Sequence, residues 1–521
     1  MTTTKTPKTL VTTAAKTPKA LVTTAAKTPR LPAVTTAAKT TTVKTAVVKA
    51  AVVKAAVAGL ALLLAAACTA PTPPRAQASA AGATVCARPQ GPPEAETATT
   101  IDVIEQAYFC ILGTYYSGAT LDARALLHAG FVALTQELNR EGRDVPEATM
   151  PALTGDRKTD WAAFEAVYRK VTDQVPDLRD RLADVTLEAI VAALDDNHAR
   201  WAHDLKRHPD SYDDDGYGLG LAANITGPQA HTNPGTALAP LFVTTVHGGA
   251  AKTAGLRPGD IIEAVNDSAP FIDGKATPAI AALYPQYPEA RPVRLRLLRQ
   301  STGHRWNATL KPGLFQRDLA SLQVVRSKLV DDDVAYVRMS GFAPDSANRV
   351  FKAVSRLRTG RMLSGVVLDL RGNGGGSPTE AIRLLSAFAH GKNTAYQCTA
   401  DARCEASPTD DTVELLGLPL VVLIDRGCAS ACEHFSSAIK DLHAGTLVGT
   451  RTAGLISGPA QPYLLTNNTL LSFPDRHHLG PDREVIDRIG VPPHHHVPLT
   501  PKDAATGYDP ALTKALTLLH K

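Results

Sequence analysis

Three almost continuously apolar segments, separated by amphipathic ones, constrain the fold of this 521-residue chain more than any other feature. "GVVLDL" (365–370) and "LPLVVLID" (418–425) are typical of strands buried on both faces of a sheet, and "TLVGT" (446–450) indicates a third strand. The intervening "SPTEAIRLLSAFAHG" begins with a capping box formed by Ser377 and Glu380, which indicates a helix. This alternation predicts a mostly parallel sheet with crossover helices.

The first 67 residues differ from the rest in charge. They contain ten Lys or Arg and no Asp or Glu, and removing them changes the formal net charge from +5 to −5. The net positive charge of the chain therefore comes from this segment and gives no indication of nucleic-acid binding. A Thr/Ala/Lys repeat precedes thirteen apolar residues at 55–67, a length typical of a signal-peptide core and too short for a membrane span.

Cys68 follows small residues directly, which predicts a lipoprotein signal and a lipid anchor, with plain secretion as the alternative. The next segment, "TAPTPPRAQASAAGA", is typical of a flexible tether. We therefore expect export to the periplasm or the extracellular space, with or without an anchor.

Six further cysteines suggest disulfides in an exported chain, and six cysteines allow fifteen connectivities. Cys398 and Cys404 are the most plausible pair because they close a short loop. Cys428 and Cys432 flank Ser430, so redox control is one interpretation. The favoured interpretation is two small buried cysteines.

From Thr99 to Leu205 the pattern is helical. "IDVIEQAYFCILGTYY", "DWAAFEAVYRKVTDQV" and "LADVTLEAIVAALDDNHARW" all return apolar residues every three or four positions.

The segment at 214–312 changes to alternation and glycine-rich turns. "APLFVTTVHGGAAKTAGLRPGDIIEAVND" predicts a strand, a short helix, a Pro-Gly turn and a second strand, and "RPVRLRLLRQ" alternates as an edge strand would. With "GYGLGL", this segment resembles a PDZ domain, which binds an extended peptide as an added strand. The resemblance implies that a terminal carboxylate meets the loop amides of Tyr217, Gly218, Leu219 and Gly220. The alternative is a fold that only braces its neighbours.

The predicted fold class is α/β, with an N-terminal helical domain, a PDZ domain and an α/β core. The predicted boundaries are a leader at 1–67, a tether at 68–98, the helical domain at 99–213, the PDZ domain at 214–312 and the core at 313–521.

Ser430, in "RGCASACEHF" (426–435), lies between a predicted buried strand and the following helix. A serine there can simply cap the helix. The same position also suits a nucleophile, because helix amides can stabilise an oxyanion. "DLRGNGGG" (369–376) ends the neighbouring strand in a glycine-rich turn and lacks the lysine and serine that complete a P-loop.

Four motifs together, "VVLDLRGNGGG", "PLVVLIDRGCASACE", "LVGTRTAG" and "IGVPPHHHV", resemble those of the carboxyl-terminal processing and tricorn-type serine peptidases. The resemblance extends over about Thr99–His520. It implies Ser430 as nucleophile and the amides of Ala431 and of Gly375 or Gly376 as the oxyanion hole.

The chain departs from one branch of that family, which pairs its serine with a lysine. Leu455 occupies the lysine position and cannot accept a proton, and Arg451 stays protonated. The resemblance to the tricorn branch then implies His198 of "LDDNHARW" as base. It also implies Asp487 of "VIDRIGV" as the orienting acid, where glutamate is commoner.

Alternatives remain for these roles. His198 could be a solvated turn residue, His434 is a rival base and Glu484 a rival acid. "GVPPHHHV" places His494 where the family usually has aspartate. Its adjacent histidines suggest zinc, but consecutive residues of an extended segment point to opposite faces, so we expect no metal and no cofactor.

The sequence therefore predicts an exported serine endopeptidase acting on unfolded or tail-bearing polypeptides, with no nucleic-acid partner. The alternative is a non-catalytic PDZ-containing envelope protein that binds peptides.

Overall fold

The computed structural model describes residues 86–91, 94–203, 210, 215–225, 237–318 and 322–520. The predicted leader, the lipid attachment at Cys68 and most of the tether lie outside these residues. No helix within the described ranges is long and apolar enough to cross a membrane.

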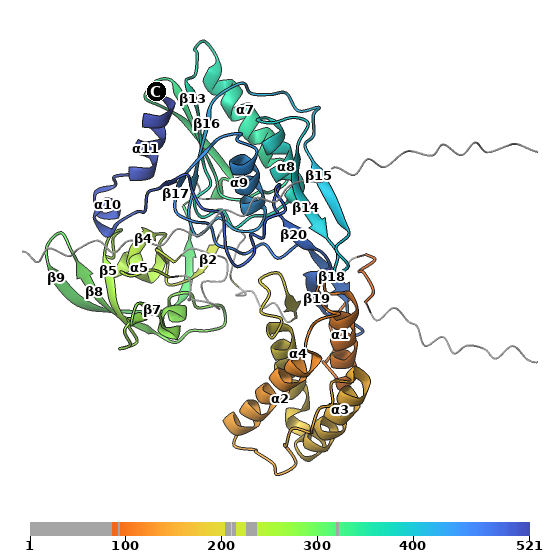
Figure 1. The fold of residues 1–521 in the computed structure, drawn as a ribbon. Coiled ribbons are helices and arrows are strands. Elements are labelled where there is room, and N and C mark those ends of the chain that lie inside the picture. The colour runs from red at the N-terminus through yellow and green to blue at the C-terminus, as the bar shows by residue number, and fades with distance from the viewer. Residues whose placement is uncertain are drawn as a thin grey trace, which may run out of the picture. The chain divides into compact units, whose positions relative to one another are not determined.

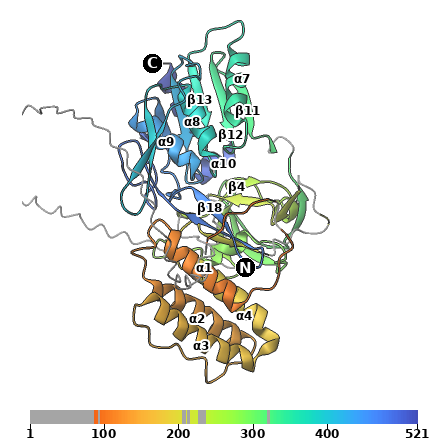
Figure 2. The same cartoon turned by 90° about the vertical axis from the view of Figure 1, so that its right-hand side faces the viewer.

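Four helices pack side by side in the N-terminal part (Figures 1 and 2). They are α1 (Ile101–Thr114), α2 (Ala123–Arg140), α3 (Arg157–Gln174) and α4 (Arg179–Ala192), the last preceded by the short η1 (Pro176–Leu178). Side chains of Thr100, Asp122 and Asp156 cap the first three helices. Gly130 lets α2 approach α4 closely, because a Cβ there would lie 2.9 Å from Cγ1 of Ile190.

The helical part shares its core with a hairpin from the far end of the chain. β1 (Arg200–Ala202) pairs antiparallel with β19 (Leu470–Pro474), which also pairs with β18 (Ala460–Leu464). Leu471 and Phe473 of β19 are fully buried in the same apolar cluster as Leu126 and Phe164. The turn between α4 and β1 is therefore fixed to the C-terminal half.

The described residues between 215 and 316, which include most of the segment predicted at 214–312 to be a PDZ domain, form small antiparallel sheets with short helices. Pairing strands are β3 (Leu221–Ala223) with β4 (Val243–Val246), β5 (Ile261–Val265) with β8 (Val293–Arg299) and β9 (His304–Leu310), and β6 (Phe271–Ile272) with β7 (Lys275–Ala276). The helical turns are α5 (Gly249–Thr253) and η3 (Pro278–Leu283).

The edge-strand prediction for "RPVRLRLLRQ" is wrong, because β8 lies between β5 and β9. Its alternation arises because Val293, Leu295 and Leu297 are buried while Arg294 and Arg296 are exposed.

The C-terminal part is built on a six-stranded sheet in the order β11–β12–β13–β16–β17–β21. Its strands are β11 (Val325–Val330), β12 (Val334–Met339), β13 (Gly365–Asp369), β16 (Leu420–Ile424), β17 (Thr446–Gly449) and β21 (His495–His496). Only the β11–β12 pair is antiparallel in this sheet, and the other four pairs are parallel. The predicted mostly parallel sheet is therefore confirmed.

Helices cover both faces of this sheet. Val366, Leu368 and Val422 pack in one apolar cluster with α7 (Ser346–Arg358), α8 (Pro378–Ser386) and α9 (Ala431–Asp441). Val367 and Val421, which alternate with them, pack instead with α11 (Pro510–Leu519), which follows α10 (Pro501–Thr506). Figure 1 shows α11 on one side of β13 and β16 and α7 to α9 on the other.

Two further small sheets complete the structure. β14 (Asn393–Cys398) pairs with β15 (Cys404–Pro408) and β20 (His477–Leu479), and the Cys398–Cys404 disulfide, as predicted, closes the β14–β15 hairpin. β2 (Asp215–Gly218) pairs with β10 (Gly313–Gln316). A second disulfide joins Cys86 to Cys110 of α1.

Candidate active site

Ser430 lies between β16 and α9 in a strained backbone conformation. Its φ of 54° and ψ of −120° are rare for a residue with a side chain and cost about 1–3 kcal/mol. Its amide donates hydrogen bonds to the Leu455 carbonyl at 3.1 Å and to Oε2 of Glu433 at 3.3 Å. Two contacts on different segments thus hold this turn at the start of a helix.

The glycine-rich turn after β13 packs directly on Ser430. Gly375 has a φ of +99°, and a Cβ there would lie 2.7 Å from Cβ of Ser430 and 2.6 Å from the Ala429 carbonyl. The Ala429 amide donates to the Asn373 carbonyl at 3.1 Å, which joins the two turns. Only glycine allows this approach.

His198 lies in the turn between α4 and β1, with Nε2 at 3.1 Å from Oγ of Ser430. Its Nδ1 lies 3.2 Å from Oγ of Ser457. Burial lowers the pKa of His198 by more than the nearby carboxylates of Asp196 and Asp487 raise it. The imidazole is therefore neutral at neutral pH and able to accept a proton.

Hydrogen-bond directions fix the tautomer of this imidazole. The Ser457 hydroxyl donates its single proton to Oδ1 of Asp196 at 2.7 Å. Ser457 must then accept a hydrogen bond from Nδ1–H of His198. Nε2 consequently carries the lone pair that faces Ser430, which is the tautomer a general base needs.

Asp196 is held from three sides. Its Oδ1 also accepts the His198 amide at 2.8 Å, and its Oδ2 accepts the hydroxyl of Tyr115, at the end of α1, at 2.7 Å. The sequence interpretation missed Ser457, Asp196 and Tyr115. Asp196 stands two residues before His198 in "LDDNHARW", whereas the roles of Ser457 and Tyr115 have no local signal.

Asp487 does not take the orienting position predicted for it. Its Oδ1 accepts the Ile456 amide at 3.1 Å and Nδ2 of Asn197 at 3.2 Å. The Ser457 hydroxyl occupies the place beside Nδ1 of His198 where the predicted carboxylate would lie. Asp487 therefore acts on His198 as a neighbouring charge that raises its pKa.

The predicted oxyanion donors differ in availability. The Ala431 amide is at the first position of α9, where a helix offers no internal acceptor. The Gly375 amide already donates to Oδ1 of Asn373 at 2.9 Å, so Gly375 is a poor candidate. The next residue, Gly376, has a φ of +132°. The backbones of the residues on either side of it form hydrogen bonds with the backbone of Phe342. The amides of Ala431 and Gly376 remain the better pair.

Glu433 is a fully buried carboxyl group beneath the nucleophile turn. Besides the Ser430 amide, it accepts hydrogen bonds from Thr452 Oγ1 and from the amides of Gly454 and Leu455, at 2.5, 2.6 and 2.7 Å. Burial raises its pKa to about 7, against the opposing effect of these donors. Glu433 therefore joins the 452–455 loop to Ser430.

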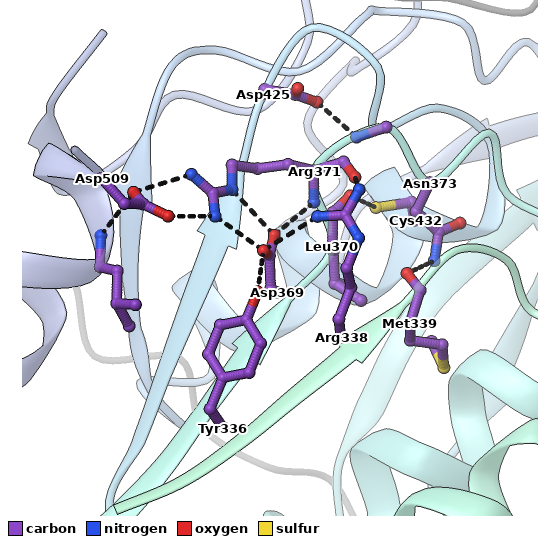
Figure 3. A network of polar contacts seen from close by, with 12 residues as sticks. Tyr336, Arg338, Met339, Asp369, Leu370, Arg371, Asn373, Asp425, Cys432 and Asp509 are labelled. Carbon is purple, nitrogen blue, oxygen red and sulfur yellow. Dashed lines mark hydrogen bonds and ion pairs between the residues drawn. The ribbon is translucent and has the colours of Figure 1, made fainter. Parts of the chain in front are cut away.

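An ionic network fixes the glycine-rich turn to the sheet and to α11 (Figure 3). Buried Asp369 accepts hydrogen bonds from the Tyr336 hydroxyl at 2.6 Å and from Arg371 at 2.7 Å, and Arg371 also pairs with Asp509 at 2.7 Å. Burial alone would raise the pKa of Asp369, but Arg371, Arg338 and the Tyr336 hydroxyl together outweigh burial and keep the carboxyl ionised. Oδ1 of Asp425 accepts a hydrogen bond from the Gly372 amide at 2.8 Å. This bond joins the glycine-rich turn to the nucleophile turn.

The rival residues lie elsewhere. Nε2 of buried His434 pairs with Thr394 Oγ1 at 2.9 Å, and burial lowers its pKa to about 4. Glu484 accepts the Asp482 amide at 3.0 Å. Nδ1 of His494 accepts the Leu447 amide at 2.9 Å. Across the described ranges, no group of three or more His, Cys, Asp or Glu side chains is arranged to hold a metal ion.

The predicted peptide-binding residues are partly engaged within the chain. Tyr217 and Gly218 lie opposite Leu314 and Gly313 of β10. The carbonyl of Leu219 accepts the Ala251 amide, and that of Gly220 accepts the His247 amide.

The two cysteines beside Ser430 are fully buried, as expected, and they are bonded to each other. Cys428 and Cys432 form a disulfide with a Cα–Cα distance of 5.3 Å. Because Cys428 and Cys432 are only four residues apart across the start of a helix, their Cβ atoms can come together. The hydrophobic periodicity of the sequence did not indicate this disulfide.

Comparison with known proteins relates the chain to peptidases. Residues 333–497 match the family model described as peptidase family S41. The chain is 27% identical over 340 residues to carboxyl-terminal-processing peptidase 2 of Arabidopsis thaliana, covering 61% of each chain. It is 32% identical over 245 residues to the carboxyl-terminal-processing protease of Synechocystis sp., covering 46% of this chain and 52% of that protein. The predicted resemblance is thus confirmed, and the chain spans between half and two thirds of these relatives.

Solved structures share the fold. Mature CPAF in complex with lactacystin matches with a TM-score of 0.50 and 13% identity, covering 80% of this chain and 97% of that one. A CPAF mutant matches with a TM-score of 0.51 at the same identity, covering 81% and 97%. The mixed helix-and-sheet fold of this chain is therefore shared with these solved structures.

Proposed function

We propose that this chain is an exported serine endopeptidase that hydrolyses peptide bonds of unfolded or tail-bearing polypeptides. The observation that carries the proposal is the 3.1 Å contact between Oγ of Ser430 and Nε2 of His198 on a strained strand–helix turn. The match of residues 333–497 to peptidase family S41 supports it.

In the first step, Nε2 of His198 takes the Ser430 proton while Oγ attacks the substrate carbonyl carbon. The amides of Ala431 and Gly376 stabilise the oxyanion. The Asp196 carboxylate, through the Ser457 hydroxyl, stabilises the imidazolium that forms. His198 then gives the proton to the leaving amine, and a water molecule, deprotonated by His198, hydrolyses the acyl-enzyme.

We further propose that the predicted PDZ segment, residues 214–312, captures the carboxyl terminus of the substrate, as the PDZ resemblance implies. Gly218 and Gly220, with φ of +135° and +79°, have backbone conformations that residues with a side chain rarely adopt. Amidating the carboxyl terminus of a bound peptide should weaken binding by about 1–3 kcal/mol, the cost of leaving donors unpaired. Calorimetry on acid and amide forms tests this, and equal affinities would leave the segment a structural brace.

Export is supported by three disulfides among the described residues, because such bonds persist in oxidising compartments. Mass spectrometry of the native amino terminus tests it, with a lipidated Cys68 expected. Cytosolic protein with an intact Met1 would contradict export, and an unmodified start beyond Cys68 would remove only the anchor.

The catalytic proposal is tested with a fluorophosphonate probe. Wild-type protein should be labelled on Ser430, as peptide mapping would show, and Ser430→Ala should not be labelled. A wild-type protein that binds peptides but is neither labelled nor able to cleave them would favour the non-catalytic alternative.

A further inference from the structure

A disulfide encloses the nucleophile. Cys428 lies two residues before Ser430 and Cys432 two residues after it, and both are fully buried. Their bond joins the turn that leaves β16 to the first turn of α9. Ser430, with its φ of 54°, is therefore inside a ring of five residues closed by a covalent bond.

The surroundings make this ring part of the active-site scaffold. The Cys428 carbonyl accepts the Ala453 amide at 3.0 Å, next to the 454–455 segment that contacts Glu433. Sγ of Cys432 lies 4.0 Å from the Leu370 carbonyl, where the glycine-rich turn begins (Figure 3). The two bonded cysteines, one through its backbone and one through its sulfur, thus contact both segments that fix Ser430 and its oxyanion donors.

The ring is too short for a large effect on overall stability. A disulfide stabilises chiefly by restricting the unfolded chain, and this effect grows with the number of residues enclosed. The separation of four residues at Cys428–Cys432 is the smallest of the three disulfides, against 6 at Cys398–Cys404 and 24 at Cys86–Cys110. Its main effect is therefore local, on the turn that it encloses.

A strained conformation persists only where the surrounding structure over-determines it. We propose that the Cys428–Cys432 disulfide is the positioning element that holds Ser430 in its reactive conformation, so that peptide hydrolysis depends on the oxidation of these two cysteines. The inference rests on the proposed peptidase function.

The redox step uses a dithiol as reductant. One thiolate of the dithiol attacks a sulfur of the Cys428–Cys432 bond and forms a mixed disulfide, and its second thiol displaces the cysteine. Two electrons and two protons pass to the chain, which gains two thiols, and the reductant leaves as a cyclic disulfide. The chain would be inactive while reduced and active once the bond forms in an oxidising compartment.

The direct test compares two double variants. Cys428→Ala with Cys432→Ala should lower kcat and the rate of fluorophosphonate labelling at least tenfold, with cooperative unfolding retained and KM within twofold of wild type. Cys398→Ala with Cys404→Ala, which removes the short ring of the β14–β15 hairpin, should keep kcat within twofold. A Cys428/Cys432 double variant with wild-type kcat would overturn the proposal, as would an equal loss in the control.

Because the first variant could fail to fold, titration of the folded wild-type protein with dithiothreitol provides an independent test. Alkylation of free thiols followed by mass spectrometry measures the reduced fraction of each disulfide. Activity should fall in step with reduction of Cys428–Cys432 and return on reoxidation. Activity that persists while this bond is reduced, or a bond that resists the dithiol until the protein unfolds, would overturn the redox dependence. Wild-type protein that neither cleaves peptides nor reacts with the probe would instead refute the peptidase function itself.

Discussion

The side chains around Ser430 show how a weak nucleophile is prepared by its neighbours. Ser457 donates to Asp196, so it must accept from His198, and this one constraint leaves Nε2 free to face Ser430. The resemblance of the motifs to a known peptidase family was sufficient to select Ser430 and His198 as candidates. Selecting Ser457 requires the fold, because 259 positions separate it from His198.

The two candidate acids should differ in effect at this scale. Asp196→Asn should lower kcat by about 10²–10⁴-fold, since an amide at this position can donate to Ser457 and reverse the hydrogen bonds that set the tautomer. Asp487→Asn should lower kcat by less than tenfold, because Asp487 acts on His198 only as a nearby charge. Steady-state kinetics of both variants, with thermal unfolding as the control, check this, and a larger loss in Asp487→Asn would restore the original assignment.

The pH dependence follows from the lowered pKa of His198. Activity needs the neutral imidazole, so kcat/KM should rise with pH through a midpoint below about 6.5, the ordinary histidine value. Asp487→Asn removes a charge that raises this pKa, so its midpoint should move to still lower pH. A pH–rate profile of each protein measures the shift, and a wild-type midpoint above the ordinary value would contradict the geometry.

At the scale of elements, the site is formed where two strand–turn–helix units end side by side. β13 and β16 are parallel neighbours, so the glycine-rich turn and the nucleophile turn emerge at the same edge of the sheet. The order of apolar and amphipathic segments was enough to predict this. The sequence pattern did not reveal the central position of β8 or the Cys428–Cys432 bond, because both depend on distances in space.

The Gly375→Ala variant should distinguish the effect of the close approach between the two turns from the effect of backbone strain. A Cβ at Gly375 would overlap Ala429 and Ser430, whereas one at Gly372, also at positive φ (+73°), would meet only Nη2 of Arg338 at 4.0 Å. Both variants should lose about 1–3 kcal/mol of stability from strain. Only Gly375→Ala should lose probe reactivity, by at least 100-fold in labelling rate. Equal reactivity of the two variants would show that the turns need not touch.

At the scale of the whole molecule, the proposed base and nucleophile come from different parts of the chain. His198 precedes β1, which pairs with β19, and Ser430 begins α9 on the parallel sheet. Helical periodicity predicted the bundle, yet no pattern in the sequence indicated that Leu471 and Phe473 would complete its core. The β1–β19 pairing, together with the hydrogen bonds of Ser457 to Asp196 and of Asn197 to Asp487, therefore holds His198 near Ser430.

Two substitutions of core residues by alanine test whether packing around the β1–β19 pairing controls the position of His198. Phe473→Ala should destabilise the protein by about 3–5 kcal/mol and Leu297→Ala by about 2–5 kcal/mol, because both side chains are fully buried. At a temperature where both variants remain folded, kcat should fall in Phe473→Ala, beside β1, and stay near wild type in Leu297→Ala, in β8. Calorimetry and kinetics on the same samples check this, and matched kcat values would contradict the coupling.

The central claim, that Ser430 and His198 act as one catalytic unit, is tested most directly by kcat of Ser430→Ala, His198→Ala and the double variant. The account predicts that each single variant loses about as much as the double variant, because neither group works without the other. His198→Ala with wild-type turnover beside an inactive Ser430→Ala would contradict it and require another base.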